Sequence, residues 1–203
     1  MLPLIHSFEG GGRIEAAFRA WAGKAHTARL QGGWDRGGMG RYTIVAVDPY
    51  CVLSARGDAV CRTTRDGEEA WRGDPFTALE REYRRLRGWE GSPGGTFLPF
   101  LGGGIGYLGY GLRHFVERVP ARASLDLPTP DLYFAFYDVA LVYDHRDDRG
   151  YLVSTGLPEE GEAARHRAAA RLDEARAWLD ERPAGVGRAS LSAKNRKGGH
   201  AGR

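Results

Sequence analysis

The alternation of apolar and polar positions predicts three amphipathic helices. In each of three stretches, apolar residues recur at the spacing of one helical face. The stretches begin near Arg13, Pro75 and Pro158, and their apolar positions are Ile14, Phe18 and Trp21; Phe76, Leu79, Tyr83 and Leu86; and Ala164, Ala168, Leu172, Ala175 and Leu179. The boundaries agree, because Asp74 is suited to cap the second helix and Pro183 to end the third.

Strands are predicted where β-branched and aromatic residues run together between turn residues. The stretches are 2–8, 27–31, 41–47, 51–56, 59–64, 131–144 and 151–155. A hairpin turning at Gly57-Asp58 pairs Ser54 with Cys61 and sets Cys51 opposite Thr64. Residues 131–144 are almost uninterruptedly apolar, which favours one strand buried on both faces. Helices scattered among hairpin-linked strands predict an α+β fold of mostly antiparallel sheets with flanking helices.

Composition and charge narrow the class of protein. Among 203 residues, 42% are hydrophobic and 27% charged, as in a soluble globular domain, and no apolar run reaches about 18 residues. Five of the 29 lysines and arginines lie in residues 183–203, which contain no acid. The preceding part is therefore nearly neutral, which argues against a nucleic-acid-binding surface. The N-terminus lacks the features of a signal peptide, so a cytoplasmic location without membrane association is expected.

Local motifs offer little catalytic chemistry. Cys51 and Cys61 have no neighbouring histidine, so they are expected to be ordinary buried thiols of a reducing compartment. Residues 104–109 satisfy G-x-G-x-x-G, but the prolines that follow leave no room for the crossover helix of a dinucleotide-binding unit. A glycine-rich strand packed closely against its neighbour is the expected alternative. From the residues alone, the chain is a soluble α+β domain without a recognisable catalytic constellation.

Five segments in order resemble the N-terminal region of a known family, the component I subunits of anthranilate synthase and aminodeoxychorismate synthase. The segments are Leu4-Ile5-His6-Ser7, residues 40–49 (GRYTIVAVDP), Pro75-Phe76 with its helix, residues 102–110 (GGGIGYLGY) and Tyr137-Asp138 to Asp144-His145. The glycine-tyrosine segment is the most specific of them. His6 stands where anthranilate synthases usually carry glutamate, which favours the aminodeoxychorismate branch of folate synthesis.

The resemblance implies a share in chorismate amination. Complete family enzymes add ammonia to chorismate with Mg²⁺, taking the ammonia from a glutamine amidotransferase subunit. Their chorismate and Mg²⁺ sites belong to a C-terminal domain with the segments G-D-x-x-Q and P-[IL]-[KR]-G-T. Neither segment occurs in these 203 residues, so no catalytic residue, metal ligand or cofactor is expected within them.

The resemblance also implies a tryptophan-binding pocket. The matching positions are Ser7 on the first segment and Met39, Gly40, Arg41 and Tyr42 at a loop–strand junction. Exposed glycine backbone, an aromatic wall and a hydroxyl suit an amino-acid zwitterion with an indole. The alternative is that these are only core and turn residues.

The resemblance divides the chain into three expected regions and leaves several functions open. Residues 1–155 are expected to form the component I-like domain, 156–182 a helix leading toward the missing chorismate-binding domain, and 183–203 a basic disordered tail. The first hypothesis is the non-catalytic N-terminal part of an aminodeoxychorismate synthase component I, truncated or frameshifted and inactive alone. The alternatives are the same part of an anthranilate synthase, a free-standing tryptophan-binding or interaction module, and a basic-tailed nucleic-acid binder.

Overall fold

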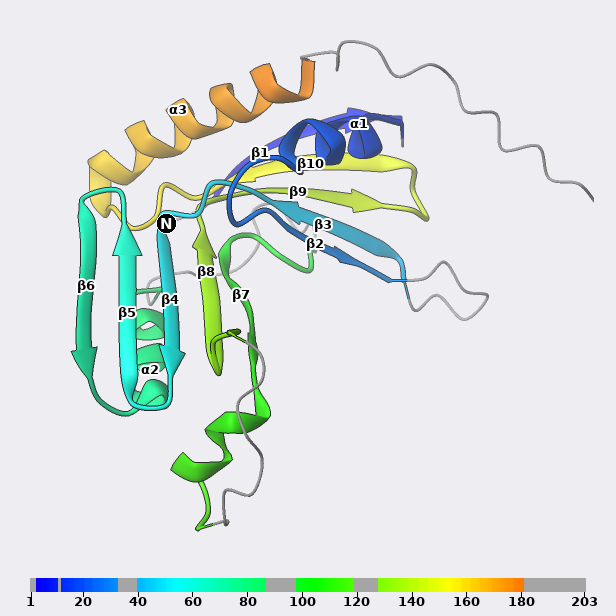
Figure 1. Ribbon diagram of the computed structural model, residues 1–203. Coiled ribbons are helices and arrows are strands. Elements are labelled where there is room, and N and C mark those ends of the chain that lie inside the picture. Colours follow the sequence, from blue (N-terminus) through cyan, green and yellow to red (C-terminus); the bar gives the residue numbers. More distant parts are fainter. Residues whose placement is uncertain (1–2, 11, 33–39, 87–97, 119–127, 181–203) are drawn as a thin grey trace, which may run out of the picture.

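Two five-stranded antiparallel sheets meet at a corner to give the molecule an L shape (Figure 1). The computed structural model describes residues 3–10, 12–32, 40–86, 98–118 and 128–180. Sheet A contains, in spatial order, β1 (Leu4–Glu9), β10 (Arg149–Ser154), β9 (Val139–Asp144), β3 (Tyr42–Ala46) and β2 (Ala28–Gln31). Sheet B contains β6 (Gly67–Arg72), β5 (Ala59–Thr64), β4 (Cys51–Arg56), β8 (Leu132–Tyr137) and β7 (Gly103–Leu108). The predicted α+β class is confirmed.

The helices cover the outer faces of the two sheets (Figure 1). They are α1 (Gly12–Trp21) and α3 (Gly161–Asp180) over sheet A, and α2 (Pro75–Arg85) over sheet B, with a short 3₁₀ helix, η2 (Tyr110–Phe115), after β7. The Asp74 side chain caps α2 by accepting hydrogen bonds from the backbone N–H groups of Phe76 and Thr77, as predicted. No helix in the described part of the chain is both long and apolar enough to cross a membrane.

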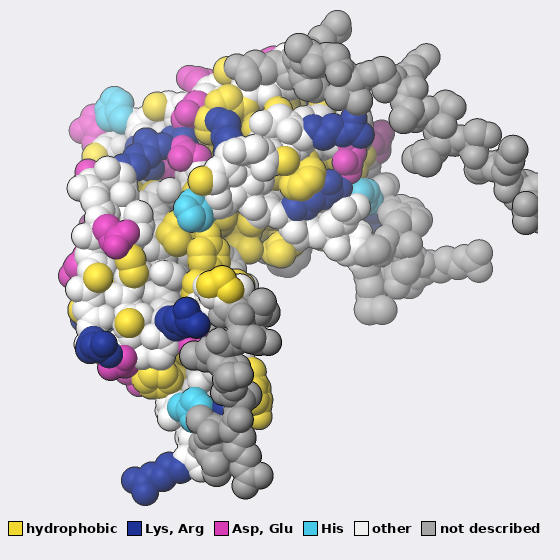
Figure 2. All heavy atoms as spheres, in the orientation of Figure 1, with side chains coloured by type: hydrophobic (Ala, Val, Ile, Leu, Met, Phe, Trp, Pro, Cys, Tyr) yellow, Lys and Arg dark blue, Asp and Glu magenta, His cyan; other side chains and the backbone are white. Residues whose placement is uncertain are grey.

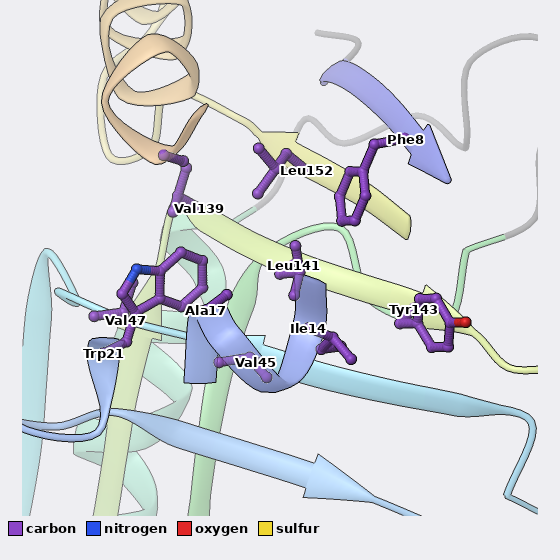
Figure 3. Packing of buried hydrophobic residues seen from close by; sticks show 11 residues of the cluster. Phe8, Ile14, Ala17, Trp21, Val45, Val47, Val139, Leu141, Tyr143 and Leu152 are labelled. Carbon is purple, nitrogen blue, oxygen red and sulfur yellow. The ribbon is translucent and has the colours of Figure 1, made fainter. Parts of the chain in front are cut away.

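The outer face of sheet A packs against α1 and α3 in one hydrophobic cluster. Side chains from β1, β3, β9 and β10 pack with α1 in one cluster, and Trp21, which is 1% exposed, lies at one end of it beside Val47 and Ala17 (Figure 3). The Trp178 ring of α3 meets Trp21 edge-to-face at 5.9 Å between centroids. Both helices are thereby fixed on one face of the sheet, and no helix of the described residues lies on its other face.

The hairpin register was predicted residue for residue. Ser54 lies opposite Cys61 and Cys51 opposite Thr64. Both cysteines are free thiols; Cys51 is buried as expected, whereas Cys61, on the strand β5, is only half-buried. Burial raises the pKa of the Cys51 thiol to about 11. A protonated, buried thiol is poorly nucleophilic, which agrees with the expected structural role.

The prediction of one long strand over residues 131–144 was wrong, because the chain bends at Asp138 between β8 and β9. β8 pairs with β4 and β7 in sheet B, whereas β9 pairs with β3 and β10 in sheet A. Both strands are largely buried, so the sequence stays apolar across the point where the chain leaves sheet B and enters sheet A. Asp138, with a side chain fully buried, is the one charged residue in the interior of this stretch.

Buried ion pairs hold the corner together. The Asp138 carboxylate accepts from Arg167 Nε at 2.9 Å and from Arg171 Nε at 3.4 Å. Arg171 also reaches the turn between β3 and β4, where its Nη1 lies 2.9 Å from Asp48 Oδ2. Arg171 therefore contacts both segments in which the chain passes from one sheet to the other, at Asp48 and at Asp138.

The G-x-G-x-x-G segment forms strand β7 and no nucleotide-binding turn, as its flanking prolines indicated. A Cβ at Gly106 would lie 1.9 Å from the Tyr133 carbonyl oxygen of the neighbouring strand. Glycine is required there by close backbone approach. Strand β6 was not predicted, because its sequence GEEAWR is charged and lies at a sheet edge.

Candidate functional site

The inner face of sheet A, turned away from α1 and α3, carries two of the sequence-predicted pocket residues, Ser7 and Tyr42. Ser7 lies opposite Tyr151, which lies opposite Val142 and then Ile44. Tyr42 precedes Ile44 by two residues on β3 and so shares its face. Ser7 and Tyr42 therefore face the same side, three strand spacings apart, or about 14 Å. Tyr151 stands between them.

Apolar side chains cover this face. Leu98, Phe100 and Leu101 belong to a cluster with Val142 and Val153, which lie at the centre of the inner face. Tyr42 and Tyr151 pack at the margin of the cluster and are half-buried, whereas Ser7 is exposed on the edge strand β1. The face thus offers two aromatic rings and one free hydroxyl beside an apolar floor.

Gly40 and Arg41 shape the entry to β3. Gly40 has φ +114°, a backbone conformation that L-residues rarely adopt, so the chain turns into the strand here. Arg41 Nη2 lies 2.6 Å from Asp144 Oδ2 and 3.1 Å from Asp147 Oδ2, and its guanidinium lies 5.0 Å from the centre of the Tyr42 ring. Arg41 is therefore held by two carboxylates at the end of β9.

The Arg41–Asp144 pair shifts the titration of both groups. Burial of Asp144 favours its neutral form, but hydrogen bonds from Arg41 and from the backbone N–H groups of Arg146 and Asp147 stabilise the carboxylate. The pKa of Asp144 consequently lies below its usual value. The hydrogen bond to Asp144 raises the pKa of Arg41, which stays charged.

Four of the five predicted pocket residues can be placed. Ser7 and Tyr42 share the inner face, Gly40 supplies the turn, and the Arg41 side chain binds Asp144 and Asp147. Met39 lies outside the described residues, as does the predicted tail 183–203.

A separate cleft of about 510 Å³ lies where the two sheets and α3 meet, and sequence reasoning missed it. Its walls come from the turn after α1, the β3–β4 turn, β5 and α3; the lining includes Lys24, His26, Asp48, Thr63 and Trp178. One sequence signal pointed to it: Lys24 is the only lysine before position 194, in a chain with 29 lysines and arginines.

The described residues bring no cluster of metal-binding side chains together. No group of three or more His, Cys, Asp or Glu side chains among them is arranged to hold an ion. The carboxylates of the corner, such as Asp138, are occupied by arginines.

Comparison with known proteins identifies the family. No protein-family model matches the sequence. The chain is 32% identical to aminodeoxychorismate synthase component 1 of Bacillus subtilis over 147 residues, which are 71% of this chain and 30% of that protein. It is 36% identical to anthranilate synthase component 1 of Thermus thermophilus over 158 residues, 77% of this chain and 32% of that protein.

The structural comparison agrees with these sequence matches. Anthranilate synthase component I from Streptococcus pneumoniae superposes with a TM-score of 0.51 at 22% identity, over 83% of this chain and 36% of that one. The chain spans about a third of the length of the curated relatives that it matches. The chain belongs to the aminodeoxychorismate and anthranilate synthase component I family.

Proposed function

We propose that this chain is the non-catalytic N-terminal part of an aminodeoxychorismate synthase component I, with a tryptophan pocket on the inner face of sheet A. The observation that carries the proposal is that Ser7, Tyr42 and Tyr151 lie on the same face of sheet A, with Tyr151 between the other two. Ser7 and Tyr42 stand at positions that the family resemblance marks. A hydroxyl can bind the polar end of an amino acid, and the tyrosines can contact an indole.

Arg41 is proposed to position this pocket rather than to bind the ligand. Its guanidinium already contacts Asp144 and Asp147 and lies over the Tyr42 ring. Moving Arg41 to a ligand carboxylate would leave Asp144, whose side chain is 3% exposed, without its cation. Arg41 therefore fixes Tyr42 at the start of β3.

The non-catalytic character is supported by chemistry that the 203 residues lack. The G-D-x-x-Q and P-[IL]-[KR]-G-T segments do not occur, and the described carboxylates form no metal site. Amination of chorismate, the Mg²⁺ ion and the glutamine amidotransferase are then properties of a complete enzyme about three times as long.

An exposed apolar surface supports packing against the rest of such an enzyme. Tyr107 and Leu108 at the end of β7, with Tyr110 and Val116 around η2, are 43%, 53%, 81% and 70% exposed. Hydrophobic side chains also gather at the inner corner where the sheets meet (Figure 2). An apolar surface of this kind is typical of a face that is covered in the assembled protein.

The choice of the aminodeoxychorismate branch rests on His6. Relatives of both types match at similar identity, 32% for the Bacillus aminodeoxychorismate synthase and 36% for the Thermus anthranilate synthase. Overall similarity therefore does not separate the branches.

Chorismate turnover tests the proposal. The purified chain is incubated with chorismate, ammonia and Mg²⁺, with the full-length Bacillus relative as the positive control. Chorismate should remain unchanged with this chain and be consumed by the control. Formation of fluorescent anthranilate would contradict both the branch and the non-catalytic assignment. Para-aminobenzoate appearing after addition of a lyase would contradict the non-catalytic assignment alone.

A further inference from the structure

The cleft at the sheet corner is separate from the proposed tryptophan pocket. Tyr42 begins β3, whereas Asp48, on the cleft wall, follows the end of that strand. Six residues of extended chain span about 20 Å. Binding in the cleft is therefore independent of the proposed function.

The walls of the cleft are fixed by contacts from several elements. The His26 carbonyl accepts a hydrogen bond of 2.5 Å from the Tyr137 hydroxyl, and His26 Nδ1 lies 2.5 Å from the Tyr133 hydroxyl. Asp48 is held by Arg65 at 2.6 Å and by Arg171 at 2.9 Å. A cleft with fixed walls loses little conformational freedom when a ligand binds.

Backbone strain is also concentrated at this cleft. His26 and Asp48 have φ of +59° and +53°, and they are two of the three non-glycine residues with positive φ in the described part of the chain. Such conformations cost energy and persist where surrounding contacts impose them, often at binding sites.

Lys24 supplies a cation that is free to meet a ligand. Its ammonium lies 3.8 Å from the centre of the Trp178 ring. Among the described residues it forms no ion pair within 4 Å, in contrast to Arg65 beside it, which is bound to Asp48. A cation–π contact leaves the ammonium protons able to bind an anion.

The other lining residues indicate what kind of anion fits the cleft. Thr63 and Thr64 offer hydroxyls, and Pro49, Val52 and Trp178 offer apolar walls. Asp48 and Glu174 also line the cleft, but both are paired with Arg171, which leaves Lys24 as the lining cation without a carboxylate partner among the described residues. We infer that the cleft binds a small organic monocarboxylate, with its carboxylate at Lys24 and its apolar body against Val52 and Trp178.

Nuclear magnetic resonance of the ¹⁵N-labelled chain tests this inference, with benzoate as the probe. The Trp178 indole N–H signal, assigned through Trp178→Phe, should shift as benzoate is added. Lys24→Met should weaken binding at least about fivefold, the loss expected for one charge-assisted contact. Lys24→Arg should retain most of it. Arg113→Met, which removes an exposed cation on η2, should leave binding unchanged.

Two further ligands distinguish carboxylate binding from apolar adsorption and from general anion binding. Neutral benzamide and inorganic phosphate should each bind at least about fivefold more weakly than benzoate, and Ser7→Ala should not affect benzoate. Equal binding of benzamide would mean apolar adsorption only, and equal binding of phosphate would mean a general anion site. Either result, an unshifted Trp178 signal, or unchanged binding in Lys24→Met would overturn the inference.

Discussion

At the scale of single residues, the close approach of a neighbouring strand explains why position 106 is a glycine. The Cβ of an alanine at Gly106 would meet the Tyr133 carbonyl oxygen at 1.9 Å, and backbone of a central strand cannot easily move away. We expect Gly106→Ala to lower the free energy of unfolding by about 1–3 kcal/mol, as overpacking usually does. Urea denaturation measures it, with Gly12→Ala as the control because a Cβ there meets nothing within 4 Å. Equal stability of the two variants would contradict the close approach.

The buried arginine of α3 gives a second prediction at this scale. The Arg171 side chain is 5% exposed and contacts Asp138, which is fully buried, as well as Asp48. Without Arg171, Asp138 keeps only Arg167 and Asp48 keeps only Arg65. Arg171→Met should therefore cost about 1.5–3 kcal/mol of unfolding free energy, the range for lost hydrogen bonds to charged groups. Arg176→Met, at an exposed position on the same helix, should cost less than about 0.5 kcal/mol. A small effect at Arg171 would show that the corner is held by apolar packing instead.

At the scale of elements, the Arg41–Asp144 pair links the start of β3 to the end of β9 and should make stability depend on pH. The pKa of Asp144 is lower in the folded chain than the ordinary value of about 3.9. Its contribution is therefore complete above about pH 5 and is lost as the pH falls through the folded-state pKa. Asp144→Asn should be less stable near neutral pH and lose less stability between about pH 5 and pH 2.

Thermal melts over this pH range measure the difference between Asp144→Asn and the unchanged chain. Asp173→Asn provides the control, since Asp173 is 76% exposed on α3. Parallel curves for all three proteins would mean that Asp144 does not contribute to acid sensitivity.

Elements with a clear local pattern could be predicted, and those defined by distant contacts could not. Asp74 and Pro75 mark the start of α2, and Gly57-Asp58 fixes the hairpin register. The bend at Asp138 depends on which sheet each half of the stretch joins, information that the apolar pattern does not carry. Likewise, the shared face of Ser7 and Tyr42 depends on strand order, and the cleft at Lys24 on the docking of α3.

At the scale of the whole molecule, the fold separates covered faces from open ones. Helices α1 and α3 bury the outer face of sheet A, and α2 buries the outer face of sheet B (Figure 1). The inner corner receives no helix from the described residues, and the proposed tryptophan pocket lies on this side. The inner face of sheet A is instead covered by a smaller cluster in which Leu98 packs with Val142 and Val153.

Calorimetric titration of the 203-residue chain with L-tryptophan tests the central claim most directly. We expect saturable binding at one site, weakened at least about fivefold by Ser7→Ala. Tyr83→Phe, which alters an exposed tyrosine on α2, should leave the binding unchanged. Absence of binding heat, or binding that Ser7→Ala leaves unchanged, would contradict the assignment of the inner face of sheet A as an amino-acid site.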